Sequence, residues 1–253
     1  MGKSPDIRIK TPEELRILRD AGRILAGIFD EIKNLVKVGM TTGEIDQVAD
    51  SLIKRSNVVP AFKGYRGFPA CACISVNEEV IHGIPGKRVV RDGDIVGVDI
   101  GIIHQNYYSD MAVTLGIGLL EPGRQKLLDV TRQALMHGIA KARPGNRLTD
   151  ISHAVQSYVE LKGFSVVRDF VGHGIGRKLH EDPEIPNYGA PNQGPLLKAG
   201  MVFAIEPMVN MGLARIKVLS DGWTAITADK KPSAHFEHSV AITESGPLIL
   251  TVK

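Results

Sequence analysis

Two aspartates interrupt an apolar stretch of the chain, residues 94–116, which reads DIVGVDIGIIHQNYYSDMAVTLG. A polar triplet, HQN, divides this stretch into two β-branched-rich runs, the pattern typical of a β-hairpin. A turn centred on His104 and Gln105 would place Asp99 directly opposite Asp110, with Cβ atoms about 5 Å apart. Like charges this close in a half-buried sheet are unfavourable unless a cation lies between them. The two aspartates therefore indicate a cation site.

Two later apolar stretches carry one glutamate each: Glu206 lies in 201–209 and Glu237 in 235–243. If these stretches pair as the first two do, four carboxylates meet at one place. One divalent ion would leave half of that charge uncompensated, whereas a pair of ions about 3.5 to 4 Å apart is an established hydrolytic device. Oxygen ligands suit Mn, Co, Fe or Mg better than a thiolate-type zinc site.

A histidine ligand would tilt such a site toward transition metals. His173 is the best candidate, because it lies in the glycine-rich segment VGHGIG at 171–176, where the backbone can approach a site closely. His82 has the equivalent place in the first half of the chain, in HGIPG, and His180 follows His173 closely enough to reach the same cleft.

The other histidines are given smaller roles. His235 and His238 flank Glu237, and we expect them to support the site from behind the ligands. His104, His137 and His153 fall in a turn or on helices and are assigned no role. The sequence has no phosphate-binding loop, no Gly-x-Ser-x-Gly turn and no informative Cys-His pair. A metal-activated water is therefore the expected nucleophile.

The elements that position these residues repeat along the chain. Helices are predicted from Thr11, as N-cap, to before Gly39, from Thr42 to about Leu52, from Glu121 to Ala142, and from Asp150 to Lys162, with a loop over 61–69 and a strand over 72–76. Gly93 and Gly200, like Asp99 and Glu206, are separated by 107 residues. We read residues 1–253 as a single catalytic domain with two pseudo-symmetric α+β halves, about 12–118 and 119–250, which share one sheet.

Composition limits the classes of function. The chain has 253 residues, 43% of them hydrophobic, and a net charge of +3, which predicts no specific nucleic-acid partner and at most a weak ribosome association. Cys71 and Cys73 form a Cys-x-Cys pair on one face of a strand, so a structural disulfide is not expected and the reducing cytoplasm is the expected location. No apolar run is long enough to span a membrane. A monomer is expected.

The four acids and His173, with HGIPG at 82–86, VGHGIGR at 171–177 and IEPM at 205–208, resemble type I methionine aminopeptidases of the pita-bread fold. The resemblance implies helices over a shared, curved antiparallel sheet and a two-metal site whose ligands are Asp99, Asp110, His173, Glu206 and Glu237. It implies that Asp110 and Glu237 bridge the ions, that Glu206 also shuttles a proton, and that His82 and His180 contact the substrate amide. The ions would be Co, Mn, Fe, Zn or Ni.

The resemblance also implies a methionine pocket, formed by Tyr65, Phe68, Cys73, Trp223, Phe62 and Leu179, of which Phe62 and Leu179 depart from the residues common in bacterial members. The implied reaction removes the initiator methionine from nascent polypeptides with a small second residue. Two alternatives stay open. One is a proline-directed aminopeptidase or dipeptidase of the same fold, and the other is a non-catalytic pita-bread binding module.

Overall fold

The computed structural model describes residues 6–253 of the chain, and it is built on one large antiparallel sheet. The order along this sheet is β1 (Val59–Pro60), β4 (Ile95–His104), β5 (Tyr107–Gly116), β14 (Glu237–Thr243), β9 (Val202–Ile205), β7 (Gly172–Gly174) and β8 (Glu181–Ile185), with β2 (Cys73–Val76) paired to β4 and β15 (Gly246–Ile249) paired to β14. Strands from both halves of the chain therefore meet in one sheet, at the pairing of β5 with β14.

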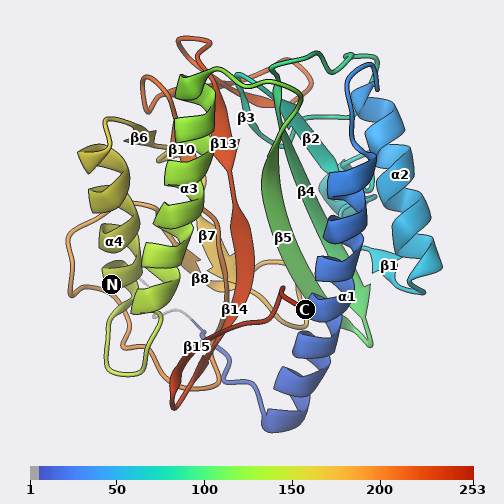
Figure 1. Ribbon diagram of the computed structural model, residues 1–253. Coiled ribbons are helices and arrows are strands. Elements are labelled where there is room, and N and C mark those ends of the chain that lie inside the picture. Colours follow the sequence, from blue (N-terminus) through green and yellow to red (C-terminus); the bar gives the residue numbers. More distant parts are fainter. Residues whose placement is uncertain (1–5) are drawn as a thin grey trace.

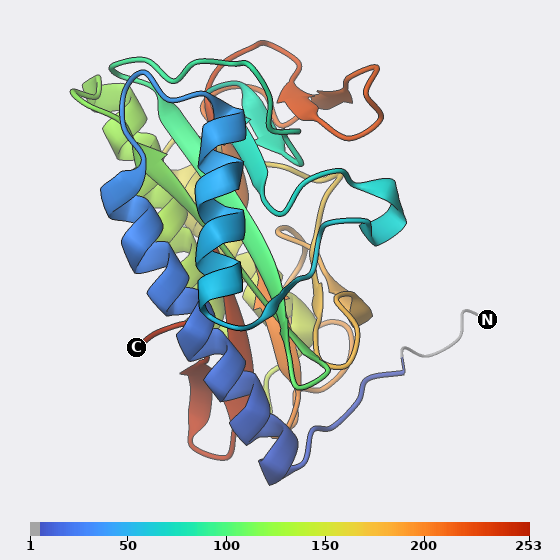
Figure 2. The same cartoon turned by 90° about the vertical axis from the view of Figure 1, so that its right-hand side faces the viewer.

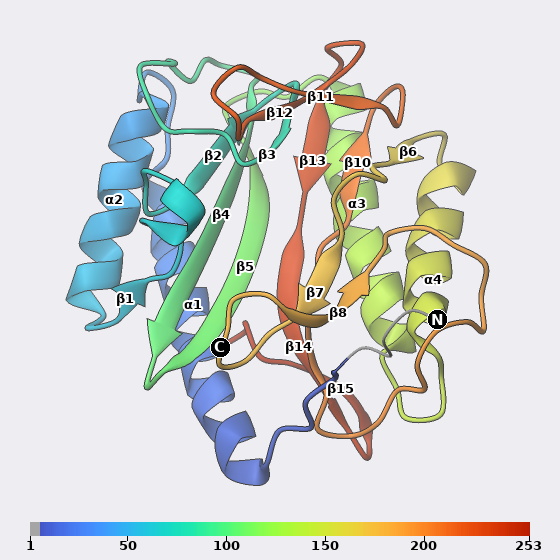
Figure 3. The ribbon, with the colours of Figure 1, turned by 180° about the vertical axis from the view of Figure 1, so that it is seen from behind.

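Four helices cover one face of this sheet, as Figure 1 shows. They are α1 (Pro12–Leu35), α2 (Thr42–Arg55), α3 (Pro122–Lys141) and α4 (Leu148–Leu161). Helices α1 and α2 lie over the strands of the first half, which Figure 2 shows from the side, and α3 and α4 lie over those of the second. The opposite face of the sheet, seen in Figure 3, carries short elements and loops instead.

Those short elements form two further three-stranded sheets and one helical turn. One sheet joins β13 (Ser233–His235), β10 (Met208–Asn210) and β6 (Ser165–Val166), and the other joins β11 (Ile216–Val218), β12 (Ala225–Thr227) and β3 (Glu79–Ile81). The 3-10 turn η1 (Tyr65–Gly67) lies in the segment predicted as a loop. Within residues 6–253, none of the helices has the length and apolar character that crossing a membrane requires.

The predicted helices are present, and their starts follow from local chemistry. Thr11 and Thr41 each accept a hydrogen bond from the backbone N–H of a glutamate three residues later, and that glutamate bonds back to the N-cap N–H. The first helix ends at Leu35, earlier than predicted, and α4 begins two residues earlier, at Leu148. The α+β class is confirmed.

The register of the β4–β5 hairpin differs from the prediction. The two turn residues are Gln105 and Asn106, with φ of 48° and 63°, as a type I′ turn requires. Consequently Asp99 lies opposite Ala112 and Asp110 lies opposite Gly101, so the two aspartates are diagonal rather than direct neighbours. Because side chains two positions apart share a face, both still project from the same side of the sheet. The conclusion that they belong to one site survives this correction.

Two hydrophobic clusters anchor the helices to the sheet. One packs α1 and α2 against β2, β4 and β5 through side chains such as Phe29, Ile45 and Val98. The other packs α3 and α4 against β9 and β14, with Phe203 and Val240 at its centre. The site described next lies where β4, β5, β14, β9 and β7 run side by side.

Candidate metal centre and adjoining pocket

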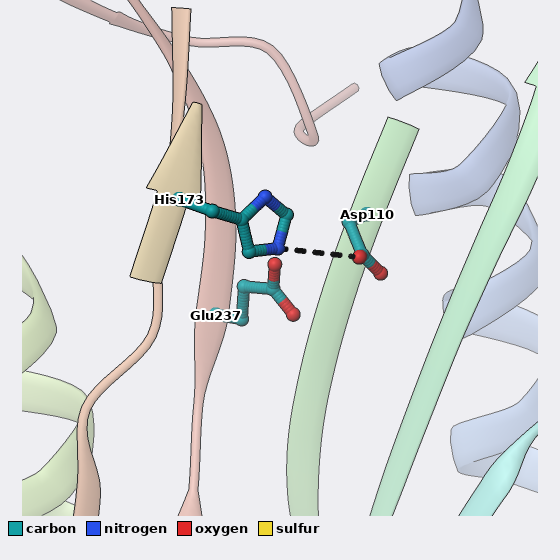
Figure 4. A group of neighbouring side chains, drawn as sticks. All are labelled: Asp110, His173 and Glu237. Carbon is teal, nitrogen blue, oxygen red and sulfur yellow. Dashed lines mark ion pairs between the residues drawn. The ribbon is translucent and has the colours of Figure 1, made fainter. Parts of the chain in front are cut away.

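Three of the predicted ligands converge on one point, although they come from strands far apart in the sequence. Asp110 is on β5, His173 on β7 and Glu237 at the start of β14, and one ligand atom from each lies within 4.8 Å of the others. Figure 4 shows the imidazole of His173 directed between the two carboxylates, with its Nε2 4.0 Å from Asp110 Oδ2. All three side chains are buried.

Glu206 completes the cluster from the end of a strand. It lies directly after β9, not inside a continuous strand over 201–209 as predicted, because the backbone breaks between β9 and β10. Its Oε1 is 3.5 Å from His173 Nε2 and its Oε2 is 3.5 Å from His235 Nε2. The side-chain amide of Asn187 donates to the backbone carbonyl of Glu206 at 3.1 Å and holds this irregular position.

The electrostatics of the cluster favour a bound cation. Burial is the main cause that raises the pKa of Asp99, Asp110, Glu206 and Glu237, that of Asp110 to about 7, and for the other three the neighbouring carboxylates raise it further. Asp99 Oδ1 and Glu237 Oε1 are buried and have no hydrogen-bond partner among residues 6–253. A buried carboxylate oxygen without a donor is costly. The residues present therefore fit divalent metal ions.

His173 is prepared as a nitrogen ligand. Its Nδ1 lies 2.9 Å from the carbonyl oxygen of Gly174, which can only accept, so Nδ1 carries the proton and Nε2 presents its lone pair to the acids. Burial lowers the pKa of His173 to about 3 and keeps the ring neutral. A Cβ added to Gly172 would lie 2.4 Å from the carbonyl oxygen of Ala204, so glycine is needed for β7 to approach β9.

A cavity of about 150 Å³ opens beside the acids. It is lined by all the residues predicted for the site, namely Asp99, Asp110, His173, Glu206, Glu237, His82, His180, Phe62, Tyr65, Phe68, Cys73, Leu179 and Trp223, and by Arg66 and Ile81. The structure thus brings together thirteen side chains that the sequence analysis assigned to ligation, catalysis or the pocket.

Two histidines face this cavity without joining the acid cluster. Burial lowers the pKa of His82 to about 4, and its ring packs edge-on against Phe170 with centroids 5.2 Å apart. Burial also lowers the pKa of His180, and Arg66 lowers it further. His180 Nδ1 lies 2.8 Å from the hydroxyl of Tyr65. When that hydroxyl donates, the neutral ring carries its proton on Nε2. Both histidines are therefore neutral hydrogen-bonding groups at pH 7.

The remaining wall of the cavity is apolar. Phe68 and Trp223 pack edge to face with centroids 5.1 Å apart, and Leu179 is buried beside them. Phe62 lies over Gly101, where an added Cβ would be 2.6 Å from its ring. Burial raises the pKa of the Cys73 thiol well above its usual value, so Cys73 contributes an uncharged side chain.

The two histidines beside Glu237 were both expected to support the site, and the structure confirms one of them. His235 is buried with its Nε2 3.5 Å from Glu206 Oε2, whereas the prediction for His238 is wrong, because its Nδ1 lies 2.8 Å from the Thr251 hydroxyl. Residues two apart on a strand share a face, and His235, not His238, is two residues from Glu237. Arg66 and Ile81 also line the cavity, and no sequence pattern singles them out.

A larger groove of about 680 Å³ lies on the helix side of the sheet, between α1 and α3. Its lining includes residues of β5 and β14, among them Met111, Val113 and His238. Within residues 6–253, the one group of side chains spaced to hold a metal ion is the Asp110, His173 and Glu237 cluster. That places the chemistry in the smaller cavity.

Known proteins are similar to this chain in both sequence and fold. A curated methionine aminopeptidase 1 of Bacillus subtilis is 54% identical over 96% of this chain and 98% of its own length. The crystal structure of methionine aminopeptidase from Thermotoga maritima superposes with a TM-score of 0.96, at 48% identity over 98% of this chain and 100% of that one.

The prolidase of Pyrococcus furiosus shares the fold alone, with a TM-score of 0.79 and 24% identity over 97% of this chain and 65% of the prolidase chain. The predicted pita-bread fold is confirmed by these neighbours. A sequence model of Metallopeptidase family M24 matches residues 16–244. The chain belongs to metallopeptidase family M24 and is similar over nearly its whole length to the methionine aminopeptidases named here.

Proposed function

We propose that the protein is a methionine aminopeptidase that hydrolyses the first peptide bond of polypeptides beginning with methionine. The observation that carries this proposal is the single cavity in which a buried acid–histidine cluster adjoins an apolar wall. The cluster offers hydrolytic chemistry, and the wall offers a place for one uncharged side chain. The likeness to curated methionine aminopeptidases over nearly the whole chain supports the same activity.

Asp99, Asp110, His173, Glu206 and Glu237 would hold the two divalent ions. When bound, such ions act as Lewis acids and make a nucleophilic water available at neutral pH. Co, Mn, Fe, Zn and Ni all suit a set of four carboxylates and one imidazole.

The chain's own groups move the proton and stabilise charge. A carboxylate oxygen of Glu206 takes the proton of the attacking water and returns it to the nitrogen of the leaving amine. His82 and His180 donate ring N–H bonds to the carbonyl oxygen as negative charge develops there. Because burial keeps both rings neutral, they act as donors and not as cations, and one well-placed donor contributes about 3 kcal/mol.

The apolar wall selects the first residue of the substrate. The methionine thioether would pack against the rings of Phe68 and Trp223, where sulfur–aromatic contacts are favourable. Phe62, Tyr65, Cys73 and Leu179 close the pocket. A small second residue is preferred because the acids and histidines occupy the cavity floor.

Further features of the proposal follow from the composition. We place the protein in the cytoplasm, acting as a monomer on nascent polypeptides, with weak ribosome association from its net charge of +3. We treat it as one catalytic domain with two related halves. The matching β-bridges Thr41–Val89 and Arg147–Leu196 support this, since they stand at equivalent places in the sequence repeat.

The experiment that tests the function replaces the proton-transferring acid. Glu206→Ala is expected to abolish release of methionine from a Met-Gly-Ser peptide, and Glu244→Ala, at an exposed turn, serves as the matched control. Near-normal turnover by the Glu206 variant would overturn the proposal. Comparison of Met-Ala-Ser with Ala-Pro peptides separates this function from a proline-directed one, and a chain that binds a protein partner but hydrolyses neither would be a binding module.

A further inference from the structure

A buried ion pair joins the segment before α1 to the loop that carries His180. Lys10 Nζ lies 2.6 Å from Glu181 Oε2, and the two side chains are only 5% and 7% exposed. Among residues 6–253, Lys10 is the one basic group within 4.0 Å of Glu181. The backbone N–H of Lys10 donates to the carbonyl of Gly200 at 2.7 Å, which ties the segment before α1 to the start of β9.

The glycine-rich segment at 171–176 makes room for this pair. A Cβ added to Gly176 would lie 2.5 Å from Lys10 Cε and 2.9 Å from Glu181 Oε1. Glycine at 176 is therefore explained by the ion pair and not by the metal cluster. Burying two charged groups is costly unless they pair with each other. Because Gly176 leaves the space that this pair occupies, the ion pair is an integral part of the packing of this loop.

The pair acts next to a group of the proposed active site. Glu181 follows His180 directly, and its second carboxylate oxygen accepts a hydrogen bond from the backbone N–H of Lys178 at 3.2 Å. The carboxylate therefore closes residues 178–181 into a compact loop. On the opposite side, the Tyr65 hydroxyl contacts Nδ1 of His180 at 2.8 Å. The ring of His180 is fixed through its own backbone and through Nδ1, and Nε2 is left for the cavity.

We propose that Lys10 is a positioning residue for His180: its ammonium group holds Glu181, and Glu181 holds the backbone that directs the His180 ring at the substrate carbonyl. This inference rests on the proposed function, because it gives Lys10 a purpose only if His180 contacts the reacting amide. It makes the segment before α1 part of the active-site framework. Displacement of a reacting group by about 1 Å can cost 100-fold in rate.

The first arm of the test measures catalysis by the metal-loaded protein on Met-Gly-Ser. Lys10→Met is expected to lower kcat about 10- to 100-fold while KM changes little, because the pocket and the acids are untouched. The same substitution in a His180→Ala background should lower kcat no further, since Lys10 acts through that ring. Lys253→Met breaks an exposed 2.8 Å pair with Asp30 and is the control, expected to match the wild-type protein.

The second arm does not depend on activity. The imidazole nitrogen signals of His180, identified by their loss in His180→Ala, are compared by NMR between metal-free wild-type and Lys10→Met proteins. The wild type should show one tautomer, protonated on Nε2, and the variant should show a mixture, while the signals of His173 stay unchanged. If Lys10→Met does not fold, Glu181→Gln takes its place, since it removes the carboxylate charge of the ion pair but keeps the side-chain volume, and the same loss of kcat and mixture of tautomers are expected.

Equal losses of kcat in the wild-type and His180→Ala backgrounds would overturn the inference and show a general structural role. Unchanged His180 signals in the variant would overturn it as well. If the wild-type protein releases no methionine, the proposed function fails, and the NMR comparison alone then decides whether Lys10 orients His180.

Discussion

The two halves of the chain contribute to one site in different ways. Residues 12–118 offer Asp99 and Asp110 from β4 and β5, two unbroken ten-residue strands joined by a tight turn. Residues 119–250 offer His173, Glu206 and Glu237 from short strands or their ends. In the first half, the alternation of side chains along regular strands places the two acids. In the second half, interruptions of the strands place the other three residues, so local glycines and single hydrogen bonds carry more of the geometry.

Histidines at equivalent places in the two halves show the same divergence. His173 lies on β7 and points into the acids, whereas His82 follows β3 in a left-handed conformation with φ of 60° and packs against Phe170. A shared sequence position has thus produced one imidazole that faces the acid cluster and one that lines the cavity beside it. A repeated sequence motif therefore predicts where a residue lies more reliably than what that residue does.

The largest effect is expected from a proposed metal ligand of the first half, residues 12–118, whose strands are regular. Asp110→Asn removes a negative charge from the proposed ligands, and turnover of Met-Gly-Ser should fall at least about 100-fold, since the loss of even an outer hydrogen-bond partner of a metal ligand costs up to that much. Metal analysis after dialysis should show fewer than the up to two ions expected for the wild type.

Asp20→Asn, at a partly exposed position on α1, is the control for that experiment and should bind metal normally. Full metal content in the Asp110 variant would show that the ions are held without the carboxylate of Asp110. Such a result would break the view that the two halves share the site.

The second prediction contrasts one glycine from each half. A Cβ at Gly174 would lie 2.2 Å from the backbone carbonyl oxygen of Asp182, whereas a Cβ at Gly97 would meet only ordinary contacts at 3.5 Å and beyond. Gly174→Ala should lower the free energy of unfolding by about 3 kcal/mol through overpacking. Gly97→Ala should raise it by up to about 1 kcal/mol, because alanine restricts the unfolded chain. Urea unfolding of both variants measures the contrast, and equal losses would contradict it.

Much of this architecture could be predicted because it depends on local chemistry. The Thr11 cap and the apolar periodicity after it predicted the start of α1, and the periodicity after Thr42 predicted α2, although the cap at Thr41 was not recognised. The four acids stood out because a charge in an apolar strand has few explanations. These signals are contained within a few residues of sequence, so no knowledge of the fold is needed to find them.

Other features depend on contacts between distant segments. The register of the β4–β5 hairpin was wrong by two residues because the HQN triplet permits more than one turn, and the left-handed pair Gln105–Asn106 is decided by the strands beyond it. The break after Glu206 is held by Asn187 from another loop. The place of Arg66 at the cavity depends on the 3-10 turn η1, whose residues show no periodic pattern.

The third prediction concerns the part of the first half that lines the pocket. Gly101→Ala would place a Cβ 2.6 Å from the ring of Phe62, and we expect that ring, which lines the pocket, to shift. KM for Met-Gly-Ser should rise about tenfold, the effect of a misplaced methylene-sized volume, with kcat nearly unchanged. Adding Phe62→Leu should restore part of the affinity. If KM is unchanged, Phe62 does not shape the pocket.

The smallest expected effect is a change in stability, and it should differ in sign between a helix of the first half, α2, and a helix of the second half, α3. Thr41 caps α2 through its side chain, whereas Glu121, the N-cap of α3, makes no side-chain cap hydrogen bond. Thr41→Ala should therefore lower the free energy of unfolding by about 1 kcal/mol, and Glu121→Ser should raise it by up to the same amount. Neither residue lines the cavity, so turnover of Met-Gly-Ser at 25 °C should stay at the wild-type value. Thermal unfolding checks the signs: loss of stability in both variants would mean that Glu121 already serves α3 as well as a capping side chain would.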